Sequence, residues 1–146
     1  MSNSALPVDR LRFTLVALGA ALLVFVLDVL FHGTLAQDMY AGYPSRPMAE
    51  VQALFPFLLL TYLGQLVTFC YMFLRIYPGR GVGNAAWWGL WGGLFVVYPN
   101  MQFFVAVRDT SWTLLWTQVM EAIALCVLAV VAFEVLYRPR PQPGAA

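Results

Sequence analysis

Four apolar stretches, each longer than twenty residues and separated by short polar links, dominate the chain. An α-helix needs about 20 apolar residues to cross the hydrocarbon layer of a bilayer, so each stretch is long enough to span it. Membrane-spanning strands are shorter and alternate between apolar and polar residues, which these stretches do not. We therefore predict four transmembrane helices, at roughly residues 11–35, 52–77, 84–107 and 112–137.

The composition indicates the same class. Apolar residues make up 62% of the 146 positions and charged residues 10%, whereas a soluble domain carries about 25% charged residues. So few charged side chains cannot cover an apolar core with polar surface, and lipid is therefore the expected solvent. The net charge is only +1, so the charge gives no reason to expect a nucleic-acid partner.

The links between the stretches are short and contain the helix-breaking residues Gly and Pro or polar residues. They lie at residues 36–51, 77–83 and 108–111. Links of this length join helices that are antiparallel neighbours. We expect an all-α integral membrane four-helix bundle with up-down-up-down order, formed as a single transmembrane domain by residues 1–146. The polar ends, 1–9 and 138–146, are expected to be mobile tails.

The arginines orient the predicted bundle, since the chain has eight of them and no lysine. Six flank helix ends on one side, and only Arg46 and Arg108 belong to the other. Basic residues concentrate on the cytoplasmic side of membrane proteins. Both termini are therefore predicted to be cytoplasmic, and the expected location of this multi-pass protein is the plasma membrane, the inner membrane of a bacterium.

The first stretch has an alternative interpretation as a secretory signal peptide, with a basic start and a cleavage-like segment at 34–36. Its apolar run, however, is about twice as long as a signal peptide's. It also contains Asp28 and His32. Cleavage would leave three spans, so an uncleaved first helix is the preferred interpretation.

Asp28 and His32 are the two ionisable residues inside that first apolar stretch. They are four positions apart, so a helix places them on one face, one turn from each other. Ionisable side chains in a membrane helix almost always face the bundle interior and find a partner, water or a ligand there. The pair therefore marks the candidate site.

The other helices bring polar residues to the same depth. With a rise of about 1.5 Å per residue, the outer half of each predicted helix contains at least one hydrogen-bonding side chain. The predicted ligand- or ion-binding residues are Asp28, His32, Gln65, Tyr98, Asn100, Gln118 and Glu121. They predict a polar pocket that opens toward the outer side of the membrane.

Three of these residues form a candidate metal site. Asp28, His32 and Glu121 supply two carboxylates and one imidazole, a set that suits Zn, Mn or Fe. A divalent metal ion is therefore the candidate cofactor. Haem is not expected, because the chain contains one His and no Cys-x-x-Cys-His motif. Cys70 and Cys126 lie in the middle of predicted helices without such spacing, which is typical of packing residues.

Two other functions are open. Chains of Asp, Glu and His carry protons across membranes, but the polar residues here are confined to the outer half, so a complete proton path is not evident. An enzyme would need a nucleophile or base beside a substrate cleft, and none of the common hydrolase or metalloprotease motifs occurs. Binding without catalysis is the favoured prediction.

The third apolar stretch is built for close packing. Ala85, Gly89 and Gly93 repeat at four-residue spacing, which lets a neighbouring backbone approach closely. Pro99 removes a helix hydrogen bond from the carbonyl of Phe95 and is expected to bend the helix. This face supports an alternative prediction for the function. In that prediction the protein is an accessory subunit that docks on a larger membrane complex through these small residues.

The segment Asp28-x-x-x-His32-Gly33, together with Tyr40, Arg46 and the Gly-rich third stretch, resembles uncharacterised small four-helix bacterial membrane proteins. The resemblance covers most of the chain and implies a bacterial membrane protein, with no established activity. The expected partners are the lipid bilayer and either another membrane protein or a second copy of the chain.

Overall fold

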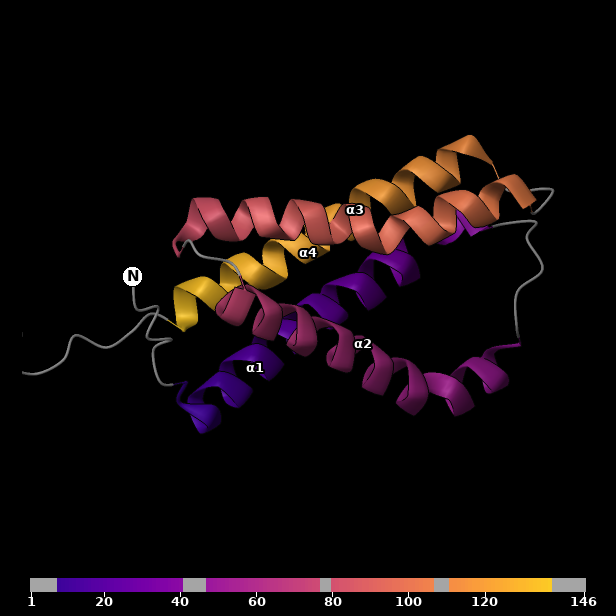
Figure 1. Cartoon of the computed structure of the whole chain (residues 1–146). Helices are drawn as coiled ribbons and strands as arrows, with labels where there is room; N and C mark the ends of the chain where they lie inside the picture. The colour runs from indigo at the N-terminus through magenta and orange to yellow at the C-terminus, as the bar shows by residue number, and fades with distance from the viewer. Residues whose placement is uncertain (1–7, 41–46, 77–79, 107–110, 138–146) are drawn as a thin grey trace, which may run out of the picture.

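The computed structural model describes residues 8–40, 47–76, 80–106 and 111–137, and these are almost entirely helical (Figure 1). The long helices are α1 (Arg10–Leu30), α2 (Met48–Ile76), α3 (Val82–Ala106) and α4 (Trp112–Leu136). Two short elements follow α1: a π-helical turn, η1 (Phe31–Leu35), and a 3-10 turn, η2 (Gln37–Tyr40). The all-helical prediction is confirmed for this part of the chain. Of the two predicted tails, only residues 8 and 9 lie within the described part of the chain.

Side-chain caps explain where two of the helices begin. The carboxylate of Asp9 accepts a hydrogen bond from the backbone N–H of Arg12 at 3.1 Å, at the start of α1. The hydroxyl of Ser111 accepts one from the N–H of Leu114 at 3.1 Å, at the start of α4. Asp and Ser are favoured at this position because they satisfy N–H groups that have no partner within the helix.

The end of α1 widens into the π turn η1. The N–H of Ala36 donates to the carbonyl of Phe31 at 2.9 Å, a spacing of five residues instead of four. Single π turns within helices are frequent at functional sites, because the extra residue changes the direction of the side chains around it. His32 lies within this turn.

Among the described residues, three helices are long and apolar enough to cross a membrane. These are Arg10–Leu35, Ala49–Ile76 and Trp112–Leu136. The fourth, α3, is 25 residues long, but its Gly and Trp residues and its amides Asn100 and Gln102 lower its hydropathy. The structure thus identifies three candidate spans, where the sequence pattern predicted four.

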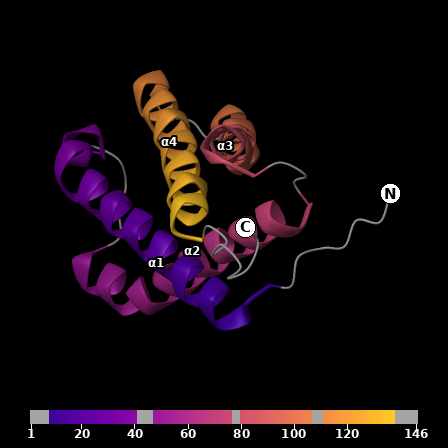
Figure 2. The ribbon, with the colours of Figure 1, turned by 90° about the vertical axis from the view of Figure 1, so that its left-hand side faces the viewer.

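The helix α4 occupies the centre of the arrangement. Figures 1 and 2 show α3 lying alongside α4, with α1 and α2 crossing each other on the other side of α4. Among the described helices, the contact between α3 and α4 is the most extensive, whereas α2 barely touches α3. Cys70 and Cys126 are buried free thiols within this packing.

The small residues of α3 explain its close contact with α4. A Cβ atom added at Gly89 would lie 2.4 Å from the Cα of Val127, and one added at Gly93 would lie 2.4 Å from the Cα of Ile123. Any side chain larger than hydrogen would therefore push the two backbones apart. Ala85, on the same face, is completely buried.

In this structure the small-residue face of α3, for which docking to another protein was the alternative prediction, lies against α4 of the same chain. The positions Gly89 and Gly93 are already covered by α4 of the same chain. A partner helix would have to displace α4 to reach them. The backbone of α3 continues past Pro99 to Ala106, and the side chain of Pro99 lies outside the described residues.

The end of the molecule opposite η1 is held together by a charged and aromatic cluster. Glu134, only 4% exposed, accepts hydrogen bonds from Arg80 Nε at 2.7 Å and from the N–H of Gly81 at 2.8 Å. The guanidinium groups of Arg12 and Arg80 lie 5.2 and 5.7 Å from the ring centre of Tyr137. Cation–π contacts of this kind stabilise the junction of α1, α3 and α4.

Candidate metal centre

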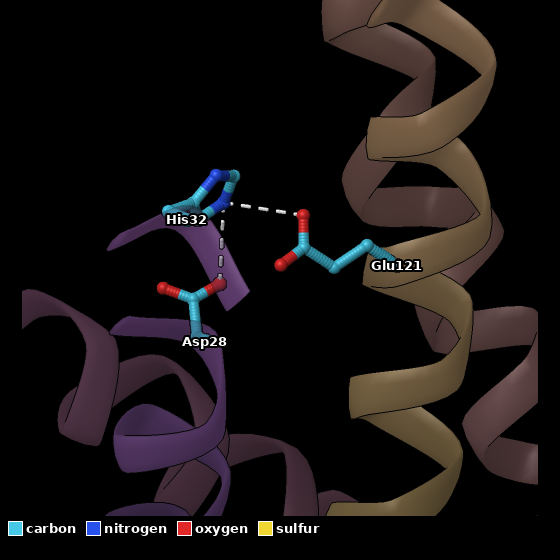
Figure 3. A group of neighbouring side chains, drawn as sticks. All are labelled: Asp28, His32 and Glu121. Atoms are coloured by element: carbon cyan, nitrogen blue, oxygen red, sulfur yellow. Dashed lines mark ion pairs between the residues drawn. The ribbon is translucent and has the colours of Figure 1, made fainter. Parts of the chain in front are cut away.

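Asp28, His32 and Glu121 converge where α1 and η1 face α4 (Figure 3). His32 Nε2 lies 3.1 Å from an oxygen of Glu121 and 3.7 Å from an oxygen of Asp28. One ligand atom from each residue can be chosen so that all three lie within 4.8 Å of one another. The three side chains are therefore a group that could hold a single metal ion.

The π turn and helix periodicity together place these groups. Asp28 is on the last turn of α1 and His32 on the turn that follows, so the two side chains project from the same side of the helix. Figure 3 shows Glu121 reaching across from α4 toward His32. The site thus joins two segments, one with Asp28 and His32 and the other with Glu121, that are about ninety residues apart in the sequence.

The second ring nitrogen of His32, Nδ1, faces the side chain of Tyr40. Tyr40, at the end of η2, places its hydroxyl 2.7 Å from His32 Nδ1. Burial raises the pKa of Tyr40 above its ordinary value, while Gln118, one turn before Glu121 on α4, is close enough to the same hydroxyl to lower its pKa slightly. The hydroxyl therefore keeps its proton at neutral pH.

The charges at the centre are incompletely compensated by the described residues. The side chain of Glu121 is only 9% exposed, and its Oε1 atom has no hydrogen-bond partner within the described part of the chain. Leaving a buried charged oxygen without a partner costs roughly several kcal/mol. Two carboxyl groups beside one imidazole therefore favour a bound proton or a bound cation among the three side chains.

A polar chamber of about 210 Å³ adjoins the three groups. Its walls include the predicted site residues Gln65 and Gln118, together with Tyr62. The predicted residue Tyr98 is not part of this chamber and lies instead along a groove between α2 and α3. The side chain of Asn100 lies outside the described residues. The structure thus gathers five of the seven predicted residues around one space.

Comparison with known proteins adds no further constraint. No protein-family model, curated protein or solved structure matches this chain. The function therefore has to be inferred from the site itself.

Tyr40 and Tyr62 belong to the site but are absent from the seven predicted binding residues. Tyr40 lies eight positions after His32, beyond the end of α1, where helix periodicity no longer predicts direction. Tyr62 lies three positions before Gln65 on α2, so the two side chains share a helix face. This spacing is the sequence signal that indicates Tyr62 as a wall of the chamber. No comparable sequence signal identifies Tyr40.

Replacing Tyr40 by phenylalanine is expected to weaken metal binding by about tenfold, because hydrogen bonds to the second nitrogen of a metal-binding histidine orient the ring. Isothermal titration of the purified variant with Zn²⁺ would measure the effect. Tyr98→Phe is the matched control, since Tyr98 is not among the chamber walls. Equal affinities for the two variants would contradict a supporting role of Tyr40.

Proposed function

We propose that this protein is an integral membrane protein that binds one divalent metal ion through Asp28, His32 and Glu121, without catalysing a reaction. The observation that carries the proposal is the convergence of three ligand atoms within 4.8 Å. The buried Glu121 Oε1 that lacks a hydrogen-bond partner among the described residues is an independent indication that a cation belongs there.

The donor set favours a first-row transition metal such as zinc, manganese or iron. Imidazole nitrogen is a common ligand of these ions, while carboxylate oxygens alone are more typical of magnesium and calcium. A metal-bound histidine usually donates its other ring N–H to a neighbouring acceptor, which fixes the ring. The hydroxyl of Tyr40, at 2.7 Å from Nδ1, is in position to accept that hydrogen bond.

The charges also favour a divalent ion. A metal of charge +2 would neutralise the two carboxylates of Asp28 and Glu121 while His32 remains uncharged. A protonated His32 alone would leave one net negative charge in a partly buried space. Neutralisation matters more inside a membrane than in water, since the low dielectric constant strengthens every uncompensated interaction.

The proposed location is a plasma membrane, the inner membrane of a bacterium, with both termini in the cytoplasm. The six-to-two distribution of arginines supports this orientation. The charged and aromatic cluster around Glu134 would then lie near the cytoplasmic surface, and the metal centre in the outer half of the bilayer. The metal would reach the site from the non-cytoplasmic side.

The proposal is tested by measuring metal content directly. Protein purified in mild detergent and incubated with Zn²⁺ is expected to retain one ion per chain after desalting, as measured by native mass spectrometry and elemental analysis. Asp28→Asn is expected to reduce the retained metal to less than about a tenth, because the amide is neutral and a poor ligand.

Asp38→Asn is the matched control for this experiment. Asp38 is an exposed acid on η2, only ten positions from Asp28, and the same substitution there is expected to leave the metal content unchanged. Wild-type protein that retains no metal would overturn the proposal. So would equal losses of metal from the two variants.

A further inference from the structure

A large apolar groove runs between α2 and α3, next to the metal centre. Its volume is about 980 Å³, within the range of typical ligand sites. The groove exists because α3 packs against α4 and leaves α2 almost without contact to α3. Its walls are mainly large apolar side chains, including Phe69, Met72, Trp88, Trp91 and Phe95.

The groove is continuous with the polar chamber beside the metal ligands. Four residues line both spaces: Gln65, Leu66, Val96 and Cys126. The chamber in turn is bordered by Asp28, His32 and Glu121. An apolar molecule in the groove would therefore have one end near the metal centre, with the amide of Gln65 at the point where the two spaces meet.

The described residues supply three ligands, whereas structural zinc sites usually have four. Three protein ligands are typical of metal sites that keep one position open for an exchangeable molecule. With Asp28 and Glu121 ionised and His32 neutral, a divalent ion at this centre carries no net charge. A neutral fourth ligand keeps that balance, whereas an anion would bring an uncompensated charge into a low-dielectric space.

From these features we propose that the metal centre keeps an exchangeable coordination position that is occupied by a small lipophilic molecule with one neutral nitrogen or oxygen donor. The molecule reaches the metal through the groove between α2 and α3, with its apolar part against the aromatic walls. This inference rests on the proposed metal binding. Beyond metal binding, the inference names the chemical class of a small molecule that binds the metal and the route by which that molecule enters.

Cobalt substitution tests the proposal, because the visible spectrum of protein-bound Co²⁺ responds to changes in its ligands. The Co²⁺-loaded protein is titrated in detergent with 1-butylimidazole at about pH 8, where an imidazole ring is neutral. We expect a saturable change in the cobalt absorption bands, with one Co²⁺ per chain still present after desalting. Azide, a small anion, is expected to cause no comparable change.

Two exposed threonines of α2 provide a matched pair of variants. Thr68 lines the groove, whereas Thr61 does not, and its hydroxyl bonds to the carbonyls of Phe57 and Leu58 in its own helix. Thr68→Phe is expected to fill part of the groove and weaken the response to 1-butylimidazole by at least about tenfold while Co²⁺ binding is kept. Thr61→Phe is expected to behave as wild type.

The outcomes separate this inference from the proposed function. If wild-type protein binds no Co²⁺ and no Zn²⁺, both are overturned. If it binds one Co²⁺ whose spectrum does not respond to 1-butylimidazole, metal binding stands and the exchangeable position is overturned. An equal response to azide overturns the preference for a neutral donor, and equal responses of Thr68→Phe and Thr61→Phe overturn the route through the groove.

Discussion

Replacing Glu121 by glutamine is expected to lower the affinity for Zn²⁺ by more than about a hundredfold, since loss of a supporting residue alone costs 10- to 100-fold. The substitution keeps the shape of the side chain but removes its negative charge and its best metal-binding oxygens. Glu121 is also the sole member of the three-residue cluster that comes from α4, so its loss would remove the contact of the proposed metal with that helix. Competition with a chromophoric zinc chelator would measure the change.

Glu50→Gln is the control for this experiment, because Glu50 is an exposed acid in the first turn of α2 and is not a member of the cluster. It is expected to bind Zn²⁺ as wild type does. An affinity of Glu121→Gln within threefold of wild type would show that Glu121 does not bind the metal.

The second large effect is expected on stability, when Gly93 is replaced by leucine. A Cβ at this position would lie 2.4 Å from the Cα of Ile123, a distance that requires the backbones of α3 and α4 to separate. Overpacking typically costs 1–3 kcal/mol, and a clash with backbone belongs at the upper end, so we expect a loss of about 3 kcal/mol. Equilibrium unfolding in mixed micelles, followed by circular dichroism, would measure it.

Gly19→Leu is the matched control, since a Cβ at Gly19 meets no atom within 4 Å. The same substitution there is expected to leave stability unchanged or to raise it slightly, because leucine favours the helix more than glycine does. Equal destabilisation by the two substitutions would mean that the contact of α3 with α4 does not form in the purified protein.

The helices were predictable because their length and apolar composition are local properties of the sequence and do not depend on distant contacts. The predicted stretches agree with the observed helices to within a few residues at most ends. The convergence of Asp28, His32 and Glu121 was also predictable, because depth and helix face depend only on position along each helix. The structure does bring these three side chains together.

What the sequence could not reveal are features that depend on how the helices meet. The spacing of Gly89 and Gly93 predicts close packing but not the partner, which is α4 of the same chain. Likewise, nothing in the sequence pairs Glu134 with Arg80, which lies 54 positions away. Tyr40 reaches His32 through two short turns whose directions no simple periodicity describes.

The π turn at Phe31–Leu35 has a consequence for how such a centre could arise or be lost. A π turn holds one residue more than an α-helical turn, so deleting a single residue within it would restore a regular helix. Everything beyond the deletion would then rotate by about 100° about the helix axis. Tyr40 would turn away from His32, although the three proposed metal ligands would still be encoded. Among related sequences, therefore, the length of this segment should distinguish chains with a supported imidazole from those without one, even where the ligands are identical.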